Sequence, residues 1–173
     1  MFANRYELKY IIQTKNMSKL LDSFGQILTP DKNNKNNLGY YNHSIYFDTH
    51  KLRFYRDKQE GLLQRLKPRI RLYRGVNDFD IKSLFLEFKQ KSDRTVFKNR
   101  VEIDAQTATE LLLGCEQSYI DTVESKNETK ELFHQLSKKY FLRPKVAVNY
   151  KRFAYFSELY PKLRVTVDHY IEE

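Results

Sequence analysis

Cations alternate with other residues along the stretch KPRIRLYRG, residues 67–75. Successive side chains of a β-strand point to opposite faces, so Lys67, Arg69 and Arg71 would share one face with Tyr73. Guanidinium groups bind phosphate oxygens in a bidentate manner, and lysine adds a compact positive charge. A solvated strand face would also favour lysine and arginine. Recurrence of the pattern elsewhere in the chain favours the first interpretation, a site for a phosphate-containing anion.

The same alternation recurs in five further segments, 4–12, 84–93, 94–103, 145–157 and 162–171. Together with the first stretch they predict one cationic sheet face. The residues expected to bind phosphate on it are Lys9, Lys67, Arg69, Arg71, Lys89, Lys91, Lys98, Arg100, Arg152 and Arg164.

Three carboxylates, Glu7, Glu87 and Glu102, fall among these cations. Carboxylate oxygens suit Mg²⁺ or Mn²⁺, and such an ion would bridge the phosphates of a bound ligand. A glutamate would serve equally well as an ion-pair partner, since a face made of cations alone repels itself. The pattern leaves both roles open for all three glutamates.

Aromatic and histidine side chains are less informative. Tyr46 and Tyr73 share the expected charged face, where they could stack on an adenine or pack against lysine stems. The four histidines are scattered without the spacing of metal ligands, which predicts surface or loop positions for them.

The elements that must position these cations follow from periodicity. Alternation predicts strands over 4–12, 40–49, 62–74, 84–93, 94–103, 145–157 and 162–171, and helical spacing predicts helices over 14–28, 104–115 and 128–142. A turn near Ser92 and Asp93 would make an antiparallel hairpin, 50–61 a turn or short helix, and 29–39 an Asn-rich loop. We therefore expect an α+β fold, an antiparallel β-barrel with helices packed outside and the charged face lining its interior.

The whole chain has 173 residues, which suits a single domain spanning residues 1–173. Its formal net charge of +9 favours an anionic partner. We expect no nucleic acid, because the alternating cations would point inward instead of forming an exposed stripe. Cys115 is the single cysteine and no apolar run reaches transmembrane length, so a cytoplasmic location is expected.

Six motifs occur in the order seen in a known family: RYELKY, SIYFDT, KPRIRLYR, LEFKQK followed by VFKNRVEI, NYKRFAYF and LRVTVD. On these motifs, residues 4–170 resemble the VTC domain. That domain is the catalytic part of the vacuolar transporter chaperone polyphosphate polymerase, and belongs to the triphosphate tunnel metalloenzymes (the CYTH-like superfamily).

The resemblance implies a basic tunnel that binds ATP or another triphosphate and inorganic polyphosphate with divalent Mn or Mg, and transfers the γ-phosphate to a growing polyphosphate chain. By position, it implies catalytic roles for Lys9, Arg69, Arg71, Lys89, Arg152 and Arg164, and metal ligation by Glu7 and Glu87. Hydrolysis of triphosphate is one alternative. Binding of polyphosphate or nucleotide without turnover is another.

Two departures from the family pattern affect these expectations. CYTH-type members begin with ExExK, whereas Arg5 makes this motif RxExK; this favours the polymerase branch and removes one metal carboxylate. Family members also continue beyond VTVDHYIEE, so we expect a domain incomplete at its C-terminus and a tunnel open on one side. The Asn-rich loop or the partner in a homodimer would cover the opening, and the chain by itself would be inactive.

Overall fold

A computed structural model describes residues 7–76, 81–92, 95–114 and 127–173. The strands are β1 (Thr29–Pro30), β2 (Tyr40–Asp48), β3 (Gln64–Gly75), β4 (Ile81–Ser92), β5 (Thr95–Ile103), β6 (Arg143–Phe156) and β7 (Arg164–Glu172). The helices are α1 (Met17–Ile27), α2 (Arg53–Gln59), α3 (Ala105–Leu113) and α5 (Glu128–Tyr140), with 3₁₀ turns at Thr14–Asn16 and Lys35–Asn37. Cys115 lies outside the described residues.

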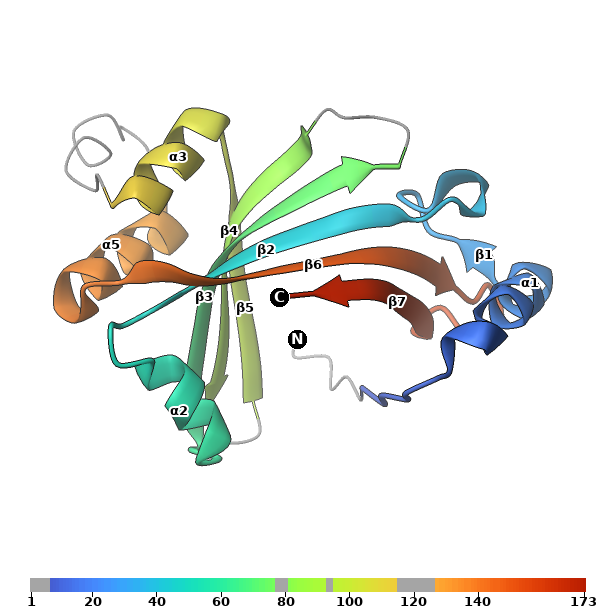
Figure 1. The fold of residues 1–173 in the computed structure, drawn as a ribbon, viewed down its shortest axis with the longest axis horizontal. Coiled ribbons are helices and arrows are strands. Elements are labelled where there is room, and N and C mark those ends of the chain that lie inside the picture. Colours follow the sequence, from blue (N-terminus) through green and yellow to red (C-terminus); the bar gives the residue numbers. More distant parts are fainter. Residues whose placement is uncertain (1–6, 77–80, 93–94, 115–126) are drawn as a thin grey trace.

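The strands form one antiparallel sheet in the order β1-β6-β2-β3-β4-β5, with β7 also paired to β6. Figure 1 shows that this sheet curls strongly, with helices at its periphery. Within the described chain β5 pairs only with β4 and β7 only with β6, so the strands make a half-barrel with one open side. The expected α+β fold with an antiparallel, curled sheet is confirmed.

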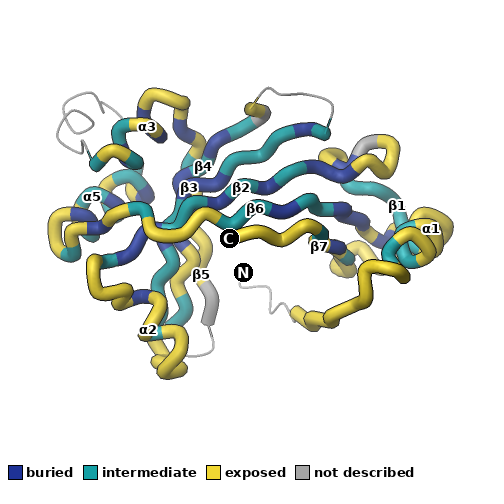
Figure 2. Tube along the Cα trace, in the orientation of Figure 1, coloured by how far each residue is buried: buried dark blue, intermediate teal, exposed yellow. Residues whose placement is uncertain are grey.

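The hydrophobic core lies on the outer face of this sheet, where alternate strand residues meet the helices. One cluster packs strand residues such as Ile70, Leu86 and Phe88 against α2, α3 and α5. A second cluster packs Phe153 and Tyr155 against α1. Figure 2 shows buried residues along the central strands and exposed residues on the outer surfaces of the helices. Because the apolar alternate residues face outward, the polar alternate residues face the concave side.

Side-chain caps explain where three helices begin. The Asp48 carboxylate accepts hydrogen bonds from the backbone N–H groups of Phe54 and Tyr55 at 3.0 and 2.9 Å, so it starts α2. Asp104 accepts from the Thr107 N–H at 2.6 Å at the start of α3, and Asn127 caps α5. The Asp48 carboxylate therefore stabilises the start of α2, the helix that follows β2.

The predicted strand over 4–12 is wrong for the residues that the structure describes. Residues 7–13 have no regular structure, and Leu8, Tyr10 and Ile11 are exposed. Alternation shows that a segment could have two different faces, but a strand also needs a neighbouring strand to accept its hydrogen bonds. Lys9 consequently does not lie on the sheet face.

The Asn-rich segment 29–39 is attached to β6 by hydrogen bonds. Its short strand β1 pairs with the end of β6, and the Asp31 N–H donates to the Ala154 carbonyl at 2.9 Å. The fully buried Asn34 donates to the same carbonyl at 3.1 Å and accepts from the Gly39 N–H at 2.8 Å. These bonds hold the segment at one end of the concave face.

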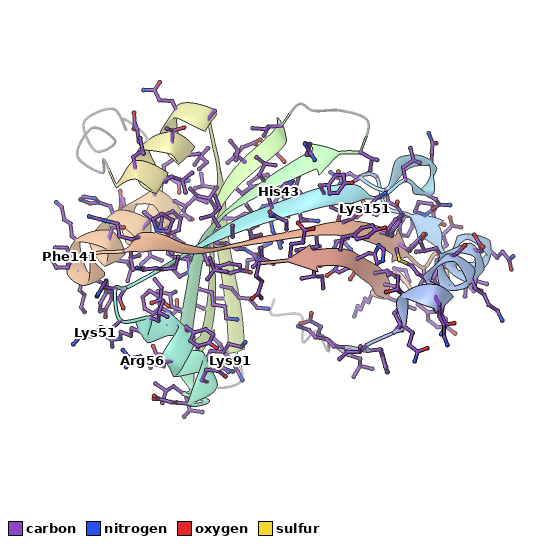
Figure 3. The ribbon with its side chains drawn as sticks, viewed as in Figure 1. His43, Lys51, Arg56, Lys91, Phe141 and Lys151 are labelled. Atoms are coloured by element: carbon purple, nitrogen blue, oxygen red, sulfur yellow. The ribbon has the colours of Figure 1, made fainter. Side chains whose placement is uncertain are left out.

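The prediction of a surface or loop position is wrong for His43, which lies within β2 (Figure 3). It is half-buried, and its Nδ1 lies 2.8 Å from the Asn149 Oδ1 on β6.

Candidate functional site

Cross-strand register brings charged side chains from β3, β4 and β5 into rows on the concave face. Arg69 pairs with Glu87, and Glu87 pairs with Arg100. In the next row Lys67 pairs with Lys89, and Lys89 with Lys98. This arrangement makes a continuous cationic surface with one carboxylate near its centre.

A cavity of about 710 Å³ opens on this concave face. Its walls come from β2 to β7 and from the Asn-rich segment. Five of the ten cations predicted to bind phosphate line it, namely Arg71, Lys98, Arg100, Arg152 and Arg164. Tyr40, Tyr73 and Phe85 add an aromatic wall, in which neighbouring ring centroids lie 6.1 and 5.9 Å apart.

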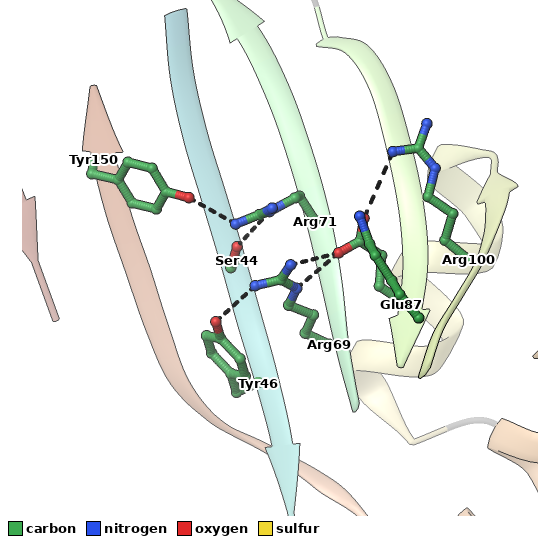
Figure 4. Close-up of polar contacts among 8 residues, drawn as sticks. Ser44, Tyr46, Arg69, Arg71, Glu87, Arg100 and Tyr150 are labelled. Carbon is green, nitrogen blue, oxygen red and sulfur yellow. Dashed lines mark hydrogen bonds and ion pairs between the residues drawn. The ribbon is translucent and has the colours of Figure 1, made fainter. Parts of the chain in front are cut away.

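Arg71 is the most deeply buried of these cavity cations, with 9% of its surface exposed. Its Nε donates to Ser44 Oγ at 3.2 Å, and its Nη2 donates to the Tyr150 hydroxyl at 2.7 Å (Figure 4). Burial raises the pKa of Tyr150 although Arg71 and Arg152 oppose this, so the phenol is neutral at neutral pH. Among the described residues no carboxylate lies within 4.0 Å of Arg71, and its hydrogen bonds go to two neutral hydroxyls. The Tyr73 ring centroid lies 5.7 Å from the guanidinium, and Glu87 acts on it only from a longer distance.

Glu87 is 1% exposed and has a different partner on each carboxylate oxygen. Oε2 accepts from Arg69 Nε at 2.9 Å and Nη2 at 2.6 Å, and Arg69 also donates to the Tyr46 hydroxyl at 2.8 Å. Oε1 lies 3.2 Å from Lys98 Nζ and 3.9 Å from Arg100 Nη1. Burial acts to raise the pKa of Glu87, but Arg69 and then Lys98 outweigh it and hold the pKa below its usual value.

The cavity cations on the β6–β7 side are neutralised by carboxylates. Arg152 donates to both oxygens of Asp168, at 2.6 and 2.7 Å, and Arg164 pairs with Asp31 at 2.5 Å. Asp31 belongs to the Asn-rich segment, which also supplies other residues to the cavity wall. On the β3–β5 side, by contrast, Lys98 and Arg100 share the single carboxylate of Glu87 with Arg69, so positive charge is in excess there.

The other five predicted cations lie away from the cavity wall. Arg69 is bound to Glu87, and Lys9 is exposed beside Glu7 at 3.7 Å. Lys67 is half-buried, and its pKa is lowered by burial and then by Lys58 and Lys89 among other cations. Lys89 and Lys91 lie further along β4, with Lys91 near its end.

A family model named VTC domain matches residues 4–172. The chain belongs to the VTC domain family. Among solved structures, the domain is similar to HpAC1 from Hippeastrum, an adenylyl cyclase candidate described as having a dominant triphosphatase activity. The TM-score is 0.56 at 16% sequence identity, and the match covers 91% of this chain and 68% of that chain. At this identity the likeness shows a shared fold.

A search among curated proteins gave no match. None of the helices in the described part of the VTC domain has the length and apolarity needed to span a bilayer.

The described residues of this VTC domain show no preformed site for a resident metal ion. They contain no group of three or more His, Cys, Asp or Glu side chains arranged to hold one. Glu87 already faces Arg69, Lys98 and Arg100, so a divalent cation beside it would meet strong repulsion. Glu7 lies on the exposed N-terminal segment, paired with Lys9. Metal ligation by these two glutamates stays a prediction, and the function proposed below uses no metal step.

Residues that the sequence did not single out hold the cavity cations of the VTC domain in place. Tyr150 shares a strand face with Arg152 two positions later, and Asp168 shares one with Arg164, so alternation alone could have found both. Ser44 lies two positions before Tyr46, so the same alternation places it on the charged face of β2. Asp31 could not be found in this way, because its contact with Arg164 depends on the path of a loop.

Proposed function

We propose that this VTC domain binds the linear chain of a triphosphate or polyphosphate in the 710 Å³ cavity. One observation carries the proposal. Arg71 is a buried guanidinium that faces the cavity, its hydrogen bonds go to two neutral hydroxyls, and no described carboxylate lies within 4.0 Å of it. Burying a cation is costly unless an anion compensates it, so the ligand is expected to supply that anion. Lys98 and Arg100 extend the positive charge beside it, as successive phosphates require.

The reaction we propose is transfer of the γ-phosphate of ATP to the end of a polyphosphate chain. A terminal polyphosphate oxygen forms a bond to the γ-phosphorus while the bond from that phosphorus to the β–γ bridging oxygen breaks, and ADP leaves. Positively charged donors stabilise charge on the transferred group and hold donor and acceptor in line. Arg71 and Arg100 are the residues we assign to this role. Catalytic roles for Lys9, Arg69, Lys89, Arg152 and Arg164 stay predictions.

Calorimetric titration with tripolyphosphate tests the binding step. The Arg71→Met variant should bind at least about tenfold more weakly than the wild type, since a charge-assisted hydrogen bond contributes about 1.5–3 kcal/mol. Arg56→Met is the matched control, because Arg56 is exposed on α2 (Figure 3), whose residues do not line the cavity. Absence of wild-type binding, or equal affinity of the Arg71 variant, would overturn the proposal.

Product analysis with ATP separates transfer from hydrolysis. Transfer yields ADP and lengthening polyphosphate, whereas hydrolysis yields ADP and inorganic phosphate. The triphosphatase activity described for the similar HpAC1 is the reason to measure both products. Binding without release of ADP would instead support a module that binds triphosphate or polyphosphate without turnover.

A further inference from the structure

The two oxygens of the Glu87 carboxylate hold different kinds of cation. Arg69, on Oε2, has a side chain that is 14% exposed, and it does not line the cavity. Lys98 and Arg100, on Oε1, have side chains that are each 47% exposed, and both line the cavity. Glu87 therefore connects a largely buried cation beside the cavity to two accessible cations on its wall.

The contacts of the two Glu87 oxygens also differ in geometry: those at Oε2 are closer and better aligned than those at Oε1. Arg69 donates two short, aligned hydrogen bonds to Oε2 and a third to the Tyr46 hydroxyl. On the other side, the fully buried Oε1 has no aligned hydrogen bond, only the ion pairs at 3.2 and 3.9 Å. Arg100 is also stacked over the Phe85 ring, 4.1 Å from its centroid. One side of Glu87 is thus a fixed clamp, and the other side is a loose electrostatic contact.

We propose that Glu87 is a positioning residue that gathers Lys98 and Arg100 at the cavity wall and releases them to an incoming phosphate chain. The inference rests on the proposed function. Without an anion, the closely spaced cations repel each other, and the Glu87 charge keeps them together. When a phosphate oxygen arrives, it replaces Oε1 as the partner of Lys98 and Arg100. Arg69 and Tyr46 keep Glu87 in place throughout.

This role makes Glu87 a competitor of the ligand for the same two cations. A ligand with a single negative charge gains little by displacing the Glu87 carboxylate. A triphosphate, in contrast, offers several negative charges to Lys98 and Arg100. Removing the Glu87 charge should therefore strengthen binding of a polyanion in the absence of metal. If Glu87 had a merely structural role, its substitution would weaken binding of the polyanion. If Glu87 were a metal ligand, its substitution would remove only the part of the affinity that depends on the metal.

Titration of tripolyphosphate in the presence of EDTA tests this inference on the Glu87→Gln variant. Glutamine keeps an oxygen acceptor for Arg69 while removing the charge, and we expect affinity to rise about tenfold over the wild type. Glu102→Gln is the matched control. It makes the same charge change on the same sheet face, but Glu102 is exposed and off the cavity wall, so its affinity should change less than about threefold. Equal or weaker binding by a folded Glu87→Gln variant would overturn the inference.

Repeating the tripolyphosphate titration with Mn²⁺ in place of EDTA tests whether Glu87 is a metal ligand instead. If Mn²⁺ strengthens wild-type binding and Glu87→Gln abolishes only that gain, Glu87 is a metal ligand and the inference fails. Should Glu87→Gln not fold, Arg69→Met/Glu87→Gln removes the buried pair together, and it should bind more tightly than Arg69→Met alone. Failure of both Glu87 variants to fold would assign Glu87 a structural role instead. Absence of wild-type binding would overturn the proposed function itself, whereas the outcomes above concern Glu87 alone.

Discussion

The Arg71 guanidinium donates to the Tyr150 hydroxyl at 2.7 Å, joining β3 to β6 across β2. This bond aims a buried cation at the cavity, and the neutral hydroxyl does not neutralise its charge. On the same sheet face Arg69 is bound to Glu87 at 2.6 Å. Two arginines separated by one residue therefore have different surroundings, and different outcomes are expected when each is changed.

Tyr150→Phe should weaken tripolyphosphate binding about threefold to tenfold, because it removes the neutral partner that orients Arg71. The variant should also lose about 1–2 kcal/mol of unfolding free energy, since a buried donor is left unsatisfied. Titration calorimetry and urea unfolding measure the two effects. Tyr55→Phe, which removes an exposed hydroxyl on α2, is the control and should alter neither. Unchanged affinity in Tyr150→Phe would show that Arg71 needs no such support.

Arg69→Met should affect stability more than binding. It leaves the buried Glu87 without its closest cation, and breaking a buried pair on one side costs about 3–5 kcal/mol. Urea unfolding of Arg69→Met and of Arg69→Met/Glu87→Gln measures this loss, and the double variant should recover part of it.

The affinities of Arg69→Met and Arg71→Met for tripolyphosphate should be measured side by side. Because Arg71 lines the cavity and Arg69 does not, the Arg71 variant should lose more affinity. A larger loss in Arg69→Met would place Arg69 in direct contact with the ligand.

Glu87 should contribute a pH-dependent part of the stability. Its pKa in the folded state lies below the ordinary value of 4.5, so the folded state binds fewer protons than the unfolded state in this range. The stabilisation is fully present above pH 4.5 and is lost as pH falls through the lowered pKa. Urea unfolding from pH 7 to pH 3 should therefore show wild type and Glu87→Gln converging at low pH. A constant difference between them would contradict the lowered pKa.

Alternation and helical spacing were sufficient to predict the strands β2 to β7, the helices α1, α3 and α5, and which strand face carries the charge. They succeed here because the central strands pack one face against helices, and a shift of one residue would turn cations such as Arg69 and Arg71 toward that apolar layer. The same reasoning failed for residues 7–12. Their alternation is as regular as that of β3, but no described strand lies beside them.

The candidate site was less predictable than the fold. Alternation placed Glu87 among cations but could not tell which of them it would contact, because this depends on the register of β3, β4 and β5. The pair Asp31–Arg164 joins residues far apart in the sequence through a loop whose path follows from the burial of Asn34. Such contacts are set by tertiary structure and leave no periodic pattern in the sequence.

The Asn-rich segment 29–39 is packed closely against β6 at Gly39. Gly39 has a φ of +74°, and a Cβ there would lie 3.0 Å from the Arg152 carbonyl oxygen and 3.1 Å from the Phe153 ring. Gly39→Ala should therefore cost both backbone strain, about 1 kcal/mol, and the displacement of β6 or of the loop. Since Gly39 and Arg152 both line the cavity, binding of tripolyphosphate should weaken as well.

Gly61→Ala is the matched control for this change. Gly61 has a similar φ of +70°, but nothing lies within 4 Å of its Cβ position, so only the backbone strain applies. Thermal unfolding should give a clearly larger loss of stability for Gly39→Ala than for Gly61→Ala, and only the former should bind tripolyphosphate more weakly. Equal losses of stability with unchanged binding would mean that the loop can move away from Arg152 without disturbing the cavity.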